Sequence, residues 1–87
     1  MLSITTEAYL VKKAYDEYTA ARKASLAVDL SDEEAFEDAL DDEMEKLDAL
    51  AEAVESFTNG QITKGEAIRM ADTAKFANLM SRVASIA

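Results

Sequence analysis

The sequence predicts an all-α fold, and three observations lead to that prediction. Proline is absent from the 87 residues and only two are glycine, so few residues interrupt a helix. Apolar residues recur three and four positions apart over long stretches, which is the period of one helical face. Two Ser/Thr-x-x-Glu patterns stand where helices could begin. We expect three antiparallel helices, at about residues 6–28, 31–58 and 63–86, in a single all-α domain spanning residues 1–87.

The first helix is expected to begin at a threonine. Thr5 or Thr6 can cap it, and Glu7 then lies in the first turn, where the helix dipole favours an anion. One face carries mostly apolar residues and is expected to pack inward. That face consists of Val11, Ala14, Tyr15, Tyr18, Ala21, Ser25 and Val28.

The second helix has the clearest boundaries. Ser31 and Glu34 form a capping-box pattern, in which the Ser31 hydroxyl accepts a hydrogen bond from the Glu34 amide. Asn59 and Gly60 mark its end, because glycine readily adopts the left-handed conformation that follows a helix. The expected core stripe of this helix is Leu40, Met44, Leu47, Ala51 and Val54.

The third helix opens with a second capping-box pattern, Thr63 to Glu66, and we expect it to continue to about residue 86. From residue 76 onward its apolar residues move to a different helical face. The large apolar side chains of this last stretch, which we treat as one candidate partner-binding surface, are Phe76, Leu79, Met80, Val83 and Ile86.

The supply of large apolar side chains is limited. The chain is 49% apolar, which is too much for a disordered protein, but 17 of its residues are alanine. Domains of this size are marginally stable on their own. The helices could therefore form a closed small bundle, in which two flanking helices cover the last stretch, or an extended helical hairpin completed by oligomerisation. We leave these two arrangements open, but we favour an interface over coverage within the chain, with a homo-oligomer or a partner protein covering the apolar surface of the third helix.

Composition excludes several functional classes. Histidine and cysteine are absent, which rules out His- or Cys-based metal sites, Ser-His-Asp triads, cysteine nucleophiles and disulfides. We expect no enzyme activity, no metal and no cofactor. Nine basic against eighteen acidic residues give a net charge of −9, which argues against direct binding to nucleic acid or to an anionic membrane. No apolar run reaches membrane-spanning length and no secretory leader is evident, so we expect a cytoplasmic protein.

Acidic residues gather on the second helix. Residues 29–55 hold 13 acids and a single base, Lys46. Seven of these acids repeat at intervals of four and three, which places them on one helical face opposite the apolar stripe. We call them the acidic row: Glu34, Asp38, Asp41, Glu45, Asp48, Glu52 and Glu55. Such a row is either a solvated face that keeps the protein soluble or a surface that binds a basic protein.

Two functions remain open. The leading hypothesis is a non-enzymatic helical protein that acts through protein–protein interaction, by self-association or by docking on a partner through the third helix, in an adaptor, assembly or chaperone-like role. The alternative is an acidic inhibitor or nucleic-acid mimic of the antitoxin, immunity-protein or phage counter-defence type, which blocks a basic site through the acidic row.

Overall fold

The computed structural model describes residues 4–87 and confirms the all-α class. Within these residues the chain forms four helices and no strand: α1 (Ile4–Ala27), α2 (Glu33–Phe57), α3 (Lys64–Met70) and α4 (Ala74–Ile86). The prediction of three helices was wrong in number, because the expected third helix is divided in two. The predicted cap at Thr5 or Thr6 was also wrong, since both threonines lie inside α1.

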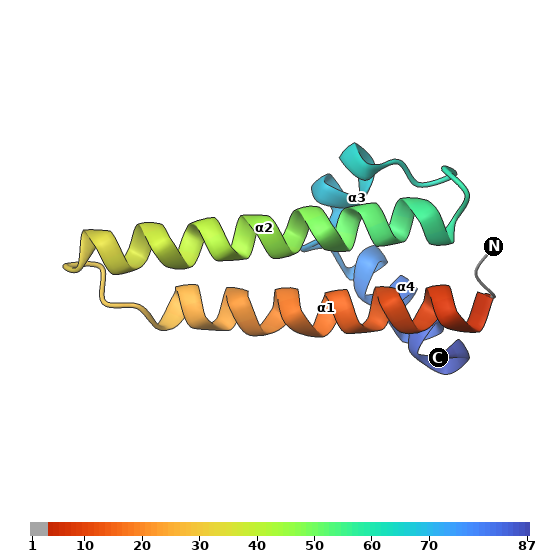
Figure 1. The fold of residues 1–87 in the computed structure, drawn as a ribbon, viewed down its shortest axis with the longest axis horizontal. Coiled ribbons are helices and arrows are strands. Elements are labelled where there is room, and N and C mark those ends of the chain that lie inside the picture. The colour runs from red at the N-terminus through yellow and green to blue at the C-terminus, as the bar shows by residue number, and fades with distance from the viewer. Residues whose placement is uncertain (1–3) are drawn as a thin grey trace.

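The two long helices, α1 and α2, form an antiparallel hairpin that sets the length of the molecule (Figure 1). A short loop joins them. In it, Asp29 accepts hydrogen bonds from the backbone amide of Ser31 at 3.0 Å and from its hydroxyl at 2.9 Å. Ser31 is therefore occupied within the loop, and the predicted Ser31 cap was wrong. Asp32 caps α2 instead, by accepting a hydrogen bond from the Ala35 amide at 3.1 Å.

The end of α2 confirms the stop signal read from the sequence. The helix ends at Phe57, and Asn59 and Gly60 follow with φ angles of 53° and 82°. The Gly60 amide donates to the carbonyl of Glu55 at 2.9 Å. This left-handed turn satisfies a carbonyl that the helix would otherwise leave without a partner, and it reverses the chain toward α3.

The segment after residue 62 begins as predicted and then departs from the prediction. Thr63 caps α3 by accepting a hydrogen bond from the Glu66 amide at 3.2 Å. The helix stops at Met70, and a second threonine restarts the chain as α4. Thr73 accepts from the Phe76 amide at 3.3 Å, while its hydroxyl donates to the Met70 carbonyl at 2.7 Å. One threonine thus stabilises both sides of the break.

The core lies where α3 and α4 meet the hairpin. These two helices gather beside one half of it, the half that holds the start of α1 and the end of α2 (Figure 1). Tyr15 of α1 and Phe76 of α4 pack edge to face there, with ring centroids 6.0 Å apart. The buried apolar residues that form this cluster are Ala8, Val11, Tyr18, Leu50, Ala51, Val54, Ala67, Phe76, Met80 and Val83. The opposite half of the hairpin is a pair of helices without this second layer.

Candidate functional site

Three of the five apolar residues predicted as a partner-binding surface are buried within the chain. Phe76, Met80 and Val83 are buried against the hairpin. Leu79 is half-buried beside the same cluster, and Ile86 is 41% exposed. The break before Ala74 changes the direction of the chain. As a result, the apolar face that begins at residue 76 turns toward α1. Coverage within the chain, the arrangement we did not favour, accounts for these three residues.

The acidic row lies along α2 as the spacing predicts, with six of its carboxylates exposed and Glu55 half-buried. The chain itself neutralises one end of the row. The ammonium group of Lys64, at the start of α3, lies 2.7 Å from Asp48 Oδ1 and 3.1 Å from Glu52 Oε1. The backbone amide of Lys64 donates to Glu55 Oε2 at 3.0 Å. Hydrogen bonds to Asp48 and then Glu52 raise the pKa of Lys64, as expected for a cation held between carboxylates.

Sequence patterns did not identify Lys64 as the partner of the row. The signal that could have found it is the short connection after α2. A chain that reverses within six residues must place the first turn of α3 beside the last turns of α2. A lysine at the first position of α3 then meets the carboxylates of that region.

The other end of the row is different. Within the part of the chain that the structure describes, no ion pair involves four of its carboxylates. These four, which we call the open acids, are Glu34, Asp38, Asp41 and Glu45. They span roughly 16 Å of helix at 1.5 Å per residue. Like charges this close repel by about 0.2–0.5 kcal/mol for each i,i+4 pair, so a cation brought to this surface relieves repulsion.

Exposed apolar side chains accompany the open acids. Leu40 and Met44, predicted as core, are 37% and 58% exposed, whereas Ala51 and Val54 of the same stripe are buried. The stripe is continuous in sequence, but α3, which packs on α2, lies only beside its later part (Figure 1). The prediction that Leu40 and Met44 belong to the core was therefore wrong.

A separate polar cluster fastens the turn between α3 and α4 to α1. Asp72 accepts hydrogen bonds from the Tyr18 hydroxyl at 3.2 Å and from the Arg22 guanidinium. The bond from Arg22 lowers the pKa of Asp72, and the same contact raises that of Arg22. Burial raises the pKa of Tyr18. The polar groups of these three side chains are hydrogen-bonded to one another, so the cluster positions the turn.

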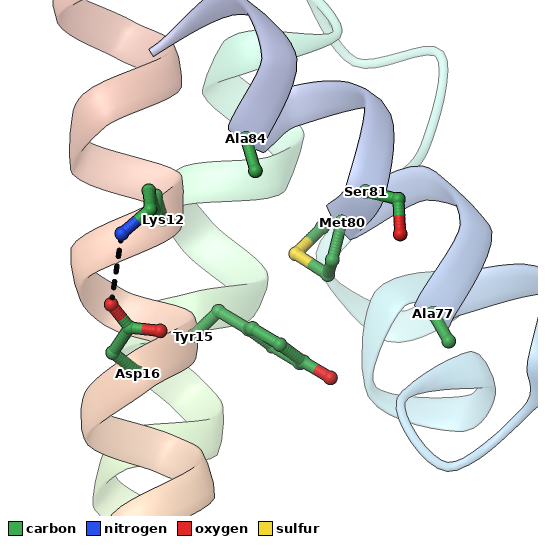
Figure 2. A pocket seen from close by; sticks show the side chains of 7 residues that line it. All are labelled: Lys12, Tyr15, Asp16, Ala77, Met80, Ser81 and Ala84. Carbon is green, nitrogen blue, oxygen red and sulfur yellow. Dashed lines mark hydrogen bonds and ion pairs between the residues drawn. The ribbon is translucent and has the colours of Figure 1, made fainter.

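A groove of about 310 Å³ runs between α1 and α4 (Figure 2). Lys12 and Asp16 form an ion pair at 3.4 Å along one wall, and the side chains of Tyr15 and Met80 lie between the helices. This volume is at the lower limit for small-molecule sites. Its two charged groups are exposed and pair with each other, so the groove offers no free charge to orient a ligand.

Comparisons of the chain with models of protein families, with curated proteins and with solved structures found no match. Across residues 4–87, no group of three or more acidic side chains is arranged to hold a metal ion. In the same range, no helix combines the length and the apolar character needed to cross a membrane. The distinguishing feature of this chain is the combination of unpaired acids and exposed apolar residues on the uncovered half of α2.

Proposed function

We propose that this chain is a cytoplasmic, non-enzymatic protein that binds a basic surface of a partner protein through the open acids. The observation that carries the proposal is the contrast along one helix. Lys64 pairs with Asp48 and Glu52, whereas no cation within residues 4–87 reaches Asp41 or Glu45. A basic partner would supply cations that pair with the open acids, as Lys64 pairs with Asp48 and Glu52.

The charge of the chain supports an inhibitor-like mode of action. A net charge of −9 concentrated on α2 steers a basic protein toward this helix and speeds association at low salt. Carboxylates that recur about every 5 Å along a helix resemble the spacing of phosphates on a nucleic-acid strand. The chain would then compete with nucleic acid for a basic site, without binding nucleic acid itself.

The test compares two variants of equal charge. Asp41→Lys with Glu45→Lys reverses two of the four open acids, while Asp16→Lys with Glu17→Lys makes the same change in net charge on exposed positions of α1, away from the row. Each variant and the wild type are used to capture proteins from an extract of the source cells, at low salt and at about 0.5 M salt. We expect a basic protein that binds the wild type and the second variant, is lost with the first, and is released by salt. Unchanged capture of the same protein by the Asp41→Lys/Glu45→Lys variant contradicts the proposal.

A second candidate is homo-oligomerisation. It is favoured by a groove of about 270 Å³ in which Ile62, Met70 and Leu79 lie beside the cations Lys75 and Arg82. This groove has the charge needed to receive the acidic face of another copy. Light scattering behind a sizing column, at low and at about 0.5 M salt, measures the solution mass directly. A monomer at both salts excludes this candidate.

A further inference from the structure

The contact between α3 and α2 shows how the acidic helix accepts another helix. Ala67 of α3 and Ala51 of α2 are both buried in the core cluster. Three residues before Ala67, Lys64 reaches across to Asp48 and Glu52. The contact therefore joins an apolar strip to an adjacent pair of carboxylates, and a helix with a lysine followed three residues later by an apolar residue fits both.

The same pattern of residues occurs seven positions earlier on α2. Leu47 and Ala51 correspond to Leu40 and Met44, and Asp48 and Glu52 correspond to Asp41 and Glu45. Seven residues are two helical turns, so each residue of the earlier set lies on nearly the same face as its counterpart. In the later set Leu47 is half-buried and Ala51 is buried, whereas Leu40 and Met44 of the earlier set are exposed.

The neighbouring helix of the hairpin extends this apolar face. Arg22 of α1 meets Asp72 in the turn that leads into α4. Leu26 lies one turn further along the same side of α1, beyond the reach of that turn, and is 76% exposed. The side of the hairpin that α3 and α4 cover at one end is thus continued at the other end by exposed leucine and methionine.

We propose that Leu40 and Met44, together with Asp41 and Glu45, form a docking surface for a basic amphipathic helix of a partner protein. This inference rests on the proposed function and specifies which structural element of the partner binds, namely a helix. The partner helix carries a lysine or arginine three residues before an apolar residue, as α3 carries Lys64 before Ala67. Methionine suits this role, because its flexible side chain adapts to different apolar surfaces. A second copy is the poorer occupant, because each copy carries a net charge of −9 and its Lys64 is already paired with Asp48 of its own chain.

The experiment uses the full chain and two synthetic peptides of the same composition. One peptide is a helix of lysine, leucine and alanine in which each lysine precedes a leucine by three residues. The other is a scrambled form with the same charge and no apolar face. Fluorescence anisotropy measures the affinity of each peptide for the wild type, for Met44→Gln, and for Ile86→Gln, a matched loss of an exposed apolar side chain on α4. Circular dichroism checks that both variants keep their helices.

We expect the wild type to bind the amphipathic peptide at least tenfold more tightly than the scrambled one. Met44→Gln should remove most of that difference and Ile86→Gln should leave it unchanged. Equal binding of the two peptides overturns the inference. An unchanged affinity of Met44→Gln for the amphipathic peptide also overturns the inference. If reversal of Asp41 and Glu45 still abolishes capture of a basic protein in that case, the proposed function remains supported by the charge alone. A self-association that Met44→Gln dissolves also overturns the inference, because a second copy then occupies the face.

Discussion

The hydroxyl of Tyr18 donates a hydrogen bond to Oδ1 of Asp72 over 3.2 Å, although the two residues lie 54 positions apart in the chain. Arg22, one turn after Tyr18, donates to the same carboxylate oxygen. Asp72 lies in the turn between α3 and α4, so these bonds attach the break in the C-terminal segment to α1. The attachment places α4 against the hairpin and leaves the far half of α2 uncovered, where the open acids lie.

The Thr73 cap should contribute measurably to stability. Thr73→Ala removes the side chain that accepts from the Phe76 amide and bonds the Met70 carbonyl. Loss of such a cap costs about 1 kcal/mol. Urea unfolding measures the change. Thr19→Ala is the matched control, because Thr19 is an exposed threonine inside α1 whose replacement favours the helix. Equal stability of the two variants would mean that α3 and α4 do not depend on this cap.

Truncation of Phe76 should strongly destabilise the chain. Phe76→Ala leaves a cavity beside Tyr15 in the core and should cost about 3–5 kcal/mol. Ile86→Ala, on the exposed side of α4, should cost less than about 1 kcal/mol. Chemical denaturation distinguishes the two. If Phe76→Ala is as mild as Ile86→Ala but changes the solution mass, α4 serves an interface and not the core.

The two glycines should respond to alanine in opposite ways. Gly60 has a φ of 82°, which an alanine adopts only with strain, so Gly60→Ala should destabilise the chain by about 1 kcal/mol. Gly65 lies in α3, and an added Cβ would meet open space. Gly65→Ala should therefore be stabilising by about 0.5–1 kcal/mol, through the lower entropy of the unfolded chain. Thermal unfolding checks both signs, and a stabilising Gly60→Ala would contradict the left-handed turn after α2.

Acid should weaken the attachment of the α3–α4 turn. The hydrogen bond from Arg22 holds the pKa of Asp72 below its ordinary value of 3.8. A carboxyl with a lowered pKa adds stability above its unfolded pKa, and this contribution is lost as the pH falls through the folded value. The wild type should therefore be more stable than Asp72→Asn at about pH 6, and the difference should vanish near pH 2.

Thermal unfolding of both proteins across this range is the measurement. Because the ion pair is largely exposed, the difference at neutral pH should be small, no more than about 5 °C in Tm. Asp42→Asn removes an exposed carboxylate of α2 and should not lower Tm at neutral pH. A difference between wild type and Asp72→Asn that persists at low pH would show that the side chain acts by shape and not by charge.

Local features of the fold could be predicted from the sequence because their causes are local. The absence of proline favours helices, and Asn59 with Gly60 ends α2 through backbone conformations that few other residues adopt. Thr63 caps α3 through a hydrogen bond to a residue three positions away. The acidic row follows from helical spacing alone. Ser31 could either cap α2 or form hydrogen bonds within the loop. It bonds to Asp29 in the loop, and Asp32 caps α2.

The sequence by itself determined an all-α chain with an acidic row on its second helix, but the tertiary structure decided which apolar residues are buried. An unbroken helix over 63–86 would turn Phe76, Met80 and Val83 away from the rest of α3's apolar face. Burying three such side chains is worth roughly 5–9 kcal/mol. Interrupting a helix for one turn costs a few hydrogen bonds of about 1 kcal/mol each, some of which Thr73 replaces. Long-range burial therefore outweighs helix continuity, and the shortened second layer leaves Leu40 and Met44 exposed beside the open acids.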